Sequence, residues 1–276
     1  MERMQRRWNH LTEQEVQEIF DRARPEDYAH GGLGGGPYML PFSDALNGKE
    51  LVLRFEDAPE IRYHFHEAHS LTMTDDSGSY TDWCDIHEAE PGLFFVHHAM
   101  KQTAPPRFQT AVLDLKKGLV TVVQAWIGNE AEPREVSRRF LFGRIEGCGD
   151  GTEPLHHFTS DLVGKAIWWI YHEQGFPPLK HIYSTEYYYS YVMNTGDKCW
   201  MASNPADYVK INDHQYLFSF LEERQTGVQG LFLINMDSLH DVGCFSGING
   251  EDRFESYTVG ARGELTTMET YLRPED

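Results

Sequence analysis

Short apolar runs separated by turn residues fill the chain from about residue 46 onwards. The runs are rich in β-branched and aromatic residues and are bounded by Gly, Pro, Asn or Asp, a pattern typical of β-strands. Eight strands are predicted in each half, at 49–55, 60–66, 69–74, 80–86, 93–99, 108–115, 118–127 and 136–145, then at 164–171, 180–193, 207–211, 215–222, 228–235, 239–246, 254–260 and 265–272. Eight strands at this spacing are typical of a β-sandwich or a small closed barrel.

One helix is predicted ahead of the strands. Residues 11–24 carry apolar residues at helical spacing and begin with a capping box, in which Thr12 precedes Glu15 by three positions. The Gly-rich stretch 31–36 follows, without the Lys and Ser/Thr of a phosphate-binding loop. A flexible connection, or a segment lying over a barrel mouth, is therefore expected there.

The two halves of the chain resemble each other. Leu46-Asn47-Gly48-Lys49 begins the first set of strands, and Leu162-Val163-Gly164-Lys165 begins the second. The phrase LFFVHH at 93–98 falls where the second half has LFSFLE at 217–222. This order predicts a tandem duplication of one β unit. Because an eight-stranded barrel can enclose one small ligand, two candidate cavities follow.

Aromatic and hydroxyl-bearing side chains are densest at residues 162–192. In a strand over 164–171, alternate positions place Ile167, Trp169 and Tyr171 on one face and Ala166, Trp168 and Ile170 on the other, so both faces are expected to be covered. After a turn at 175–178, the odd positions carry rings with polar tips, namely His181, Tyr183, Tyr187, Tyr189 and Tyr191. If that face points inward, it lines a pocket.

Composition narrows the classes of function. A formal charge of −19 opposes binding to nucleic acids and to acidic membrane surfaces, which leaves small molecules as partners. No apolar run reaches the roughly 18 residues of a membrane span, and the start of the chain does not resemble a signal peptide, so a cytoplasmic protein is expected. The four cysteines show no CxxC spacing, so neither a disulfide framework nor a zinc knuckle is predicted. The oligomeric state stays open, a homodimer included.

Histidines are concentrated in the first half of the chain. His64 and His66 share one strand face and could ligate a metal. However, Glu67 follows His66 directly and points to the other face, whereas a cupin-like site would carry its glutamate three or four residues later. We therefore expect hydrogen-bonded or solvent-facing histidines, although metal binding by the cluster from His64 to His98 stays open. No nucleophile elbow is present, and no cofactor is predicted.

Several longer phrases carry a family resemblance. They are LNGKELVLRF, LFFVHH, VLDLKKGLVTVV, DLVGKAIWWIYHEQGF, HIYSTEYYYSYV, YLFSFLEE and VGCFSGI. In these phrases the chain resembles the MoaF family, which is named for a protein of molybdenum cofactor biosynthesis and is similar to the calycins, whose barrels bind small ligands. The resemblance implies an all-β fold of two tandem lipocalin-like or calycin-like antiparallel β-barrels. The domains expected are 1–40 with a short helix and the Gly-rich segment, 41–150 with the first barrel, and 151–276 with the second.

The second half also resembles phenolic acid decarboxylases, calycin-like barrels that act without a cofactor. Over residues 162–176, that family has a strand with two tyrosines one residue apart; Tyr171 matches the second, and Trp169 replaces the first. Over residues 216–236, Glu222 takes the place of the catalytic glutamate. The family's arginine aligns beside a tryptophan, where this chain has Cys199. The resemblance thus implies a shared pocket more than a shared reaction.

These features lead to a predicted function. A carboxyl group buried among rings is suited to acid–base work near neutral pH, and tyrosine hydroxyls can donate to a developing enolate or phenolate. We expect a cofactor-independent enzyme that isomerises, cyclises or cleaves a small hydrophobic or aromatic metabolite in the second barrel. The expected catalytic residues are Glu222, Tyr171, His181 and Tyr183, and the expected substrate-binding residues are Trp169, Tyr187, Tyr189, Phe220 and His98, the last by its equivalence to Glu222 in the repeat.

Two alternatives stay open. The first is a non-catalytic small-molecule binding protein. The second, implied by the family name, is an accessory protein of molybdenum cofactor biosynthesis. It would need a site for a pterin phosphate, and the predicted cavity-lining stretches contain no cluster of Arg or Lys.

Overall fold

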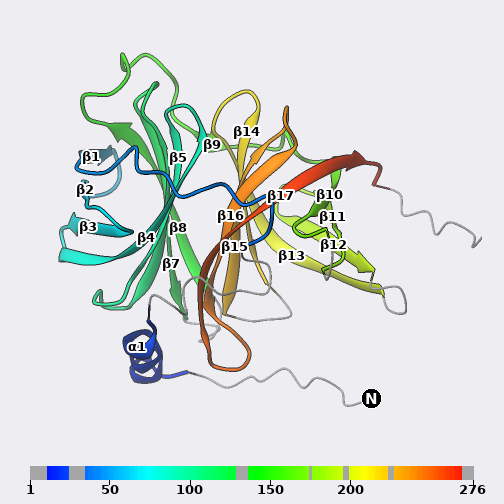
Figure 1. Ribbon diagram of the computed structural model, residues 1–276, viewed down its shortest axis with the longest axis horizontal. Helices are drawn as coiled ribbons and strands as arrows, with labels where there is room; N and C mark the ends of the chain where they lie inside the picture. Colours follow the sequence, from blue (N-terminus) through cyan, green and yellow to red (C-terminus); the bar gives the residue numbers. More distant parts are fainter. Residues whose placement is uncertain are drawn as a thin grey trace, which may run out of the picture.

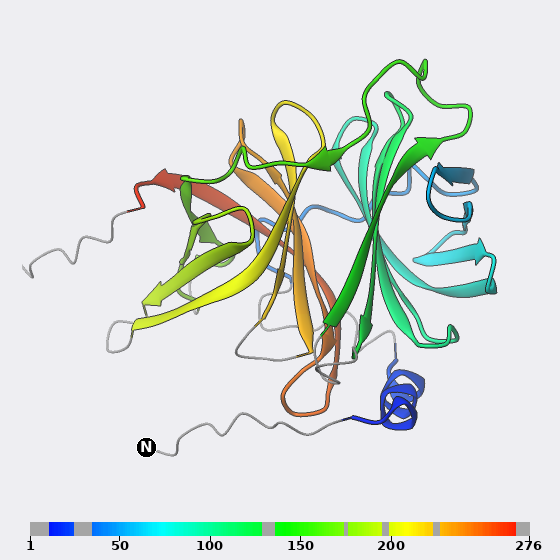
Figure 2. The same cartoon turned by 180° about the vertical axis from the view of Figure 1, so that it is seen from behind.

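The computed structural model describes residues 11–24, 35–128, 136–173, 176–194, 199–222 and 227–268. Two β-barrels lie side by side, with one helix at their lower ends as drawn in Figure 1, and Figure 2 shows the same pair from behind. The first barrel is closed by pairing of its first and last strands, and consists of β1 (Glu50–Phe55), β2 (Ile61–Phe65), β3 (Ser70–Asp75), β4 (Gly78–Glu90), β5 (Leu93–Met100), β6 (Arg107–Asp114), β7 (Leu119–Ile127) and β8 (Val136–Ile145).

The second barrel repeats this order, and its first and last strands pair in the same way. Its strands are β10 (Ala166–Ile170), β11 (Leu179–Ile182), β12 (Tyr188–Asn194), β13 (Cys199–Lys210), β14 (Gln215–Leu221), β15 (Val228–Asn235), β16 (His240–Ile248) and β17 (Phe254–Thr266). The short β9 (His157–Phe158) pairs with β13 from outside the barrel order. The predicted fold is confirmed: an all-β chain with two tandem antiparallel barrels and one short helix.

Two strand predictions in the second half were wrong. The single strand predicted at 180–193 is a hairpin of β11 and β12, because the hydroxyl of Thr185 accepts from the N–H groups of Tyr187 and Tyr188 and so forms a turn without Gly or Pro. The two strands predicted at 254–260 and 265–272 are one strand, β17, as far as the described residues reach. Gly263 marks close packing there and not a turn, since a Cβ atom at this position would lie 2.9 Å from the ring of Trp169.

The first turn of each barrel has the same hydrogen bonds. Gly48 and Gly164 both have positive φ, at 72° and 87°. The N–H of Gly48 donates to the carbonyl of Phe65 at 2.8 Å, and the N–H of Gly164 donates to the carbonyl of Tyr183 at 2.9 Å. The two halves therefore share local geometry as well as strand order, and each position of one barrel can be matched to a position of the other.

Four clusters of buried apolar side chains stabilise the described part of the chain, and the fourth lies under the helix. One fills the inside of the first barrel, and a second, largely aromatic, lies inside the second barrel. A third lies between the barrels, where outward-facing residues such as Phe95 and Val112 meet Leu217, Leu231 and Val242. Strands of the interface thus bury both faces, which explains the nearly continuous burial of β5, β6 and β15.

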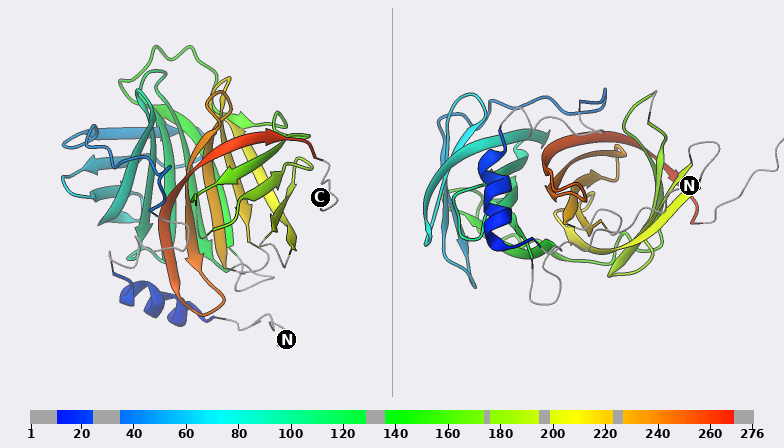
Figure 3. Two further views of the ribbon diagram at one scale, coloured as in Figure 1. Left: turned by 45° about the vertical axis from the view of Figure 1, so that its right-hand side comes forward. Right: turned by 90° about the horizontal axis from the view of Figure 1, so that it is seen from below.

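The helix α1 (Glu13–Arg22) joins the two barrels at one end (Figure 3). Its capping box between Thr12 and Glu15 is present as predicted. The ring of Phe20 is fully buried, with its centroid 5.0 Å from Phe108 of the first barrel and 5.1 Å from Phe254 of the second. The amphipathic face of α1 therefore packs on both barrels at once.

Residues 35–40 lie against the second barrel, whereas 25–34, including much of the Gly-rich stretch, lie outside the described residues. The carbonyl of Tyr38 accepts from His240 at 2.8 Å, and its hydroxyl accepts from Arg262 at 2.8 Å. A Cβ atom on Gly36 would lie 2.4 Å from the carbonyl of Tyr171, so this glycine permits close packing. The segment before the first barrel is thus held on the outside of the second.

Two further findings concern the described part of the chain. None of its helices has the length and apolar character needed to cross a membrane. All four cysteines are free; Cys84 and Cys244 are buried, Cys148 is half-buried and Cys199 is exposed.

Candidate functional site

A cavity of about 300 Å³ lies inside the second barrel. This volume is at the lower end of the range for small-molecule sites. Four tyrosines and four phenylalanines form most of its lining, and Glu222, Glu255 and His181 supply the ionisable groups. The half-buried lining residues Phe176, Met193 and Glu222 lie at or beyond strand ends and form the mouth of the cavity.

The strand register places two carboxyl groups on the same rim. The N–H of Glu222 donates to the carbonyl of Val228 at 2.9 Å, Val228 is paired with Gly247, and Gly247 is paired with Glu255. Glu222, Val228, Gly247 and Glu255 therefore form one row of paired residues across the neighbouring strands β14 to β17. A glutamate stands at each end of this row, and Gly247 has no side chain. Both carboxyl groups line the cavity from this row.

Glu255 was missed in the sequence. Its side chain is half-buried, burial raises the pKa of its carboxyl group, and Asn249 donates to Oε1 at 2.7 Å. Alternation along β17 could have found it, because Glu255 shares the inward face with Tyr257, Val259 and Ala261. However, the sequence does not show that this face lies opposite Glu222.

His181 lies deeper, on β11, and is 4% exposed. Rings surround it, with centroids 5.1 Å away at Tyr189, 5.8 Å at Phe218 and 6.2 Å at Tyr183. Burial lowers the pKa of the imidazole to about 3, so the ring is neutral at pH 7. Its Nδ1 is buried and has no hydrogen-bond partner in the described structure, so a ligand in the cavity could supply one.

Tyr171 and Tyr189 also line the cavity, as does Phe220. Burial raises the pKa of both tyrosine hydroxyls well above the usual value, so they stay protonated. Asn204 donates to the hydroxyl oxygen of Tyr189 at 3.3 Å and holds that ring in place. These hydroxyl groups can therefore act as hydrogen-bond donors inside the barrel.

Trp169 and Tyr183 lie behind the cavity lining. Both are fully buried, and the indole N–H of Trp169 donates to the hydroxyl oxygen of Tyr183 at 3.2 Å. Tyr183 in turn packs against His181. The two residues therefore support the lining from behind. The sequence analysis had predicted Trp169 as a substrate-binding residue and Tyr183 as a catalytic residue.

The placement predicted for Tyr187 was wrong. Its side chain is 68% exposed and lines a surface depression with Phe158 and Tyr208, not the cavity. The reason is the turn at Thr185, which interrupts the alternation between β11 and β12. The outer face of β10 was also predicted to be covered, but Trp168 and Ile170 there are only half-buried.

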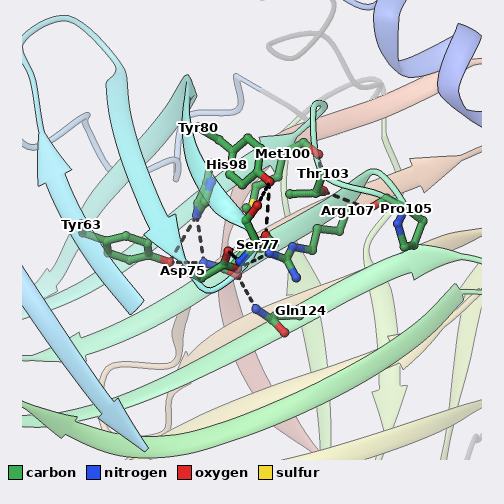
Figure 4. A network of polar contacts seen from close by, with 11 residues as sticks. Tyr63, Asp75, Ser77, Tyr80, His98, Met100, Thr103, Pro105, Arg107 and Gln124 are labelled. Carbon is green, nitrogen blue, oxygen red and sulfur yellow. Dashed lines mark hydrogen bonds and ion pairs between the residues drawn. The ribbon is translucent and has the colours of Figure 1, made fainter. Parts of the chain in front are cut away.

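His98 lies inside the first barrel, in a cluster of hydrogen-bonded side chains (Figure 4). Its Nε2 lies 3.2 Å from the hydroxyl of Tyr63, which accepts from Gln109 at 2.6 Å; Gln124 donates to Gln109 at 2.9 Å. Burial lowers the pKa of His98 to about 3. These side chains occupy the first barrel at this level, so His98 does not reach the cavity in the second.

Matched positions explain part of the space inside the second barrel. Traced from strand to strand around each barrel, the registers match Tyr63 with His181, His98 with Phe220, Arg107 with Val228 and Trp126 with Gly247. Three of these four residues are smaller in the second barrel. Gly247 also has φ of 147°, and a Cβ atom there would lie 1.9 Å from the carbonyl of Gly227. The second barrel therefore has less side-chain volume at three of these positions. Its Glu222 matches Met100 of the first barrel, so the equivalence to His98 predicted from the repeated phrases was wrong.

The histidines at 64 and 66 share a face, with ring centroids 4.3 Å apart. His64 bonds Glu50 at 2.9 Å, and His66 bonds the hydroxyl of Thr72 at 2.7 Å. Among the described residues, no group of three or more His, Cys, Asp and Glu side chains is arranged to hold a metal ion.

Comparison with known families gives two matches, one in each half of the chain. The MoaF N-terminal domain matches residues 26–129, and the MoaF C-terminal domain matches residues 156–268. No curated protein matches the chain. The likeness of the second half to phenolic acid decarboxylases stays a prediction.

Proposed function

Because the chain belongs to the MoaF family and its second domain encloses a cavity with two carboxyl groups, we propose that it is a cofactor-independent enzyme. The proposed reaction is acid–base isomerisation, cyclisation or lyase chemistry on a small hydrophobic or aromatic metabolite of secondary metabolism. We propose that it acts in the cytoplasm, where its four free cysteines stay reduced.

One observation carries this proposal. The cavity brings Glu222, Glu255, His181 and two protonated tyrosine hydroxyls together in an aromatic lining. Such a lining favours an aromatic or apolar ligand. The polar groups are few and converge on the same space, which is typical of sites that orient a ligand for chemistry.

The two carboxyl groups suit opposite roles. Burial raises the pKa of Glu255, which favours its protonated form and the role of general acid. Glu222, at the mouth, is the proposed general base that removes a proton from carbon. Tyr171 and Tyr189 then donate to the oxygen on which negative charge develops. Because His181 is neutral, we propose that its imidazole orients the substrate through a hydrogen bond and carries no proton at pH 7.

The first prediction concerns Glu222→Gln. Proton removal next to a carbonyl group can be followed without knowledge of the natural product, as exchange of hydrogen for deuterium in an aryl ketone dissolved in D2O. Ketones that bind are first selected from a panel by ligand-observed NMR. We expect Glu222→Gln to slow the exchange by roughly 10²–10⁴-fold while the ketone still binds.

Glu264→Gln is the matched control, because Glu264 is an exposed residue of the same sheet, on β17, and lies outside the cavity. It should exchange at the wild-type rate. If wild type and Glu222→Gln exchange every bound ketone equally fast, the enzymatic proposal fails and the protein is a carrier.

A non-catalytic binding protein is the second candidate, favoured by the preponderance of aromatic side chains in the lining. An accessory role in molybdenum cofactor assembly has less support. A pterin phosphate calls for Arg or Lys, and none of the described lining residues is either.

A further inference from the structure

We propose that Asn249 is a positioning residue, which keeps the acidic proton of Glu255 on the carboxyl oxygen that is left for a ligand in the cavity. The inference rests on the proposed function, in which Glu255 is the general acid. Asn249 is not among the described residues that line the cavity. It acts through Glu255, by deciding which of the two carboxyl oxygens can donate.

The orientation of the Asn249 amide is the first argument. Its Oδ1 accepts from the backbone N–H of Glu251 at 2.9 Å and from that of Arg253 at 3.2 Å. Because only the oxygen of an amide can accept, these two bonds fix which end of the side chain is the NH2 group. That group donates to Oε1 of Glu255 at 2.7 Å. The contact therefore joins a donor to a carboxyl oxygen.

The position of the proton on Glu255 follows from the chemistry of a carboxyl group. A protonated carboxyl has one hydroxyl oxygen, which donates, and one carbonyl oxygen, which accepts. Because Oε1 accepts from Asn249, it is the carbonyl oxygen, and the proton stays on Oε2. Oε2 has no hydrogen-bond partner among the described residues, and the side chain lines the cavity. Oε2 is therefore the oxygen that can donate to a ligand.

The turn that carries Asn249 is held in place. The N–H of Asn249 donates to the carbonyl of Arg253 at 2.9 Å, and the N–H of Asp252 donates to the carbonyl of Asn249 at 3.0 Å. Directly after the turn, the ring of Phe254 packs on Phe20 of α1, with 5.1 Å between centroids. The amide of Asn249 therefore has little freedom to leave Glu255.

The surroundings of Glu255 favour the protonated form that this arrangement requires. Burial raises the pKa of its carboxyl group, the bond from Asn249 opposes this rise, and the carboxylate of Glu251 adds to it. Glu222 lies at the other end of the same row, and Tyr257 lies two residues further along β17. Asn249 thus selects the oxygen that holds the proton and is not the reason that the group is protonated.

The proposed step conserves protons. The proton on Oε2 of Glu255 passes to the oxygen of a bound ketone while Glu222 takes a proton from the carbon next to the carbonyl group. An enol forms, Glu255 is left ionised and Glu222 is left protonated. The reverse transfers restore the ketone and both carboxyl groups. In D2O, Glu222 returns deuterium to the carbon once its own proton has exchanged.

Asn235 provides a matched control. Its Oδ1 accepts from the backbone N–H groups of Asp237 and Ser238, both at 2.9 Å, and its amide nitrogen donates to Oε1 of Glu90 at 2.7 Å. Neither Asn235 nor Glu90 is among the described residues that line the cavity. The same substitution at the two asparagines therefore compares one kind of contact at the cavity and away from it.

Asn249→Asp tests the proposal. The new carboxylate still accepts from the two backbone N–H groups, so the turn should be kept, but an acceptor replaces the donor to Oε1. The proton of Glu255 should then move to Oε1, between two carboxyl groups, and Glu255 should titrate at a higher pH. Exchange of the aryl ketone should nevertheless slow by roughly 10²–10⁴-fold, because no proton remains on Oε2. Asn235→Asp should change neither property.

Two measurements are needed. Carbon-13 NMR of the glutamate carboxyl groups gives the titration of Glu255, assigned by its loss in Glu255→Gln, and NMR of the ketone in D2O gives the exchange rate. If Asn249 only held the turn, a larger protonated fraction of Glu255 would leave exchange as fast as in wild type, or faster. That result would overturn the inference, as would an unchanged titration of Glu255.

A third measurement separates this inference from the proposed function. The carbonyl stretch of a bound ketone falls in frequency when its oxygen accepts a hydrogen bond, so the infrared band should be lower in wild type than in Asn249→Asp. If it is lower but no ketone exchanges, the enzymatic proposal fails and the role of Asn249 stands. If ketones exchange and the two bands coincide, only the role of Asn249 is wrong.

The wild-type protein decides the matter if Asn249→Asp does not fold. The side-chain amide signal of Asn249 should shift with the same midpoint as the carboxyl carbon of Glu255, while that of Asn235 should not follow it. An Asn249 signal that does not change as Glu255 titrates would also overturn the inference.

Discussion

At the scale of single residues, two buried imidazoles differ in their surroundings: that of His98 is hydrogen-bonded inside the first barrel, and that of His181 lines the cavity of the second. Both imidazoles are nearly fully buried, and burial lowers both pKa values to about 3. His98 has Tyr63 as a hydrogen-bond partner, whereas Nδ1 of His181 has none in the described structure. A buried nitrogen without a partner costs roughly 1–3 kcal/mol. Position 181 therefore carries a polar group that destabilises the folded state, as residues of binding sites commonly do.

This cost gives a testable prediction. His181→Phe removes the unsatisfied nitrogen and adds little volume, with the cavity beside it, so the free energy of unfolding should rise by about 1 kcal/mol. Ligand affinity should fall in the same variant. Urea denaturation and calorimetric titration would measure the two effects. A less stable variant that binds normally would show that the nitrogen is satisfied and is not part of the site.

At the scale of elements, β5 of the first barrel and β17 of the second are joined by polar contacts through His97. Its Nδ1 lies 2.9 Å from the hydroxyl of Thr110, and its Nε2 lies 2.9 Å from the hydroxyl of Ser256. Burial lowers the pKa of His97 to about 4. The neutral ring thus bridges two strands of the first barrel to one of the second.

The shift fixes the sign of a pH effect. Because the pKa of His97 is lower in the folded chain than its ordinary value of 6.5, the unfolded chain takes up a proton first as the pH falls. The contribution of neutral His97 to the free energy of unfolding is complete above about pH 6.5. It is lost toward pH 4, by up to ~1.4 kcal/mol per pH unit. His97→Gln lacks this titration, so its stability deficit at neutral pH should shrink as the pH falls. Urea midpoints across this range would measure it, and parallel curves for the two proteins would contradict it.

At the scale of the whole molecule, the barrels share too much apolar surface to behave as separate domains. The core between them contains fully buried side chains from both, and Phe20 of α1 packs on both. An isolated barrel would expose one side of this core to water. We therefore expect the chain to unfold as a single unit.

Two buried thiols can report on this unfolding. Cys84 lies in the core of the first barrel, and Cys244 lies on β16 of the second, at the interface; both have 0% exposure. With increasing urea, both should become reactive to a thiol reagent over the same concentration range, as mass spectrometry of labelled peptides would show. Labelling of one thiol well before the other would mean that the barrels unfold separately.

Local pattern was enough for much of this architecture. Alternation and turn residues predict most strands, and the repeated Leu-x-Gly-Lys heads predict a duplicated unit, because both depend only on neighbouring residues. Local pattern failed at Tyr187, where Thr185 forms a turn without Gly or Pro, and at Gly263, where a glycine serves packing.

The sequence by itself determined the two all-β units and the aromatic face that enters the second barrel. Only the tertiary structure decided that Glu255 joins Glu222 on one rim, that Trp169 and Tyr183 lie behind the lining, and that Val228 and Gly247 leave space where the first barrel holds Arg107 and Trp126. The physical reason is the separation along the chain of the residues that set each feature. Alternation is set within one strand, whereas the register between strands and the volume inside a closed barrel depend on residues far apart in the chain.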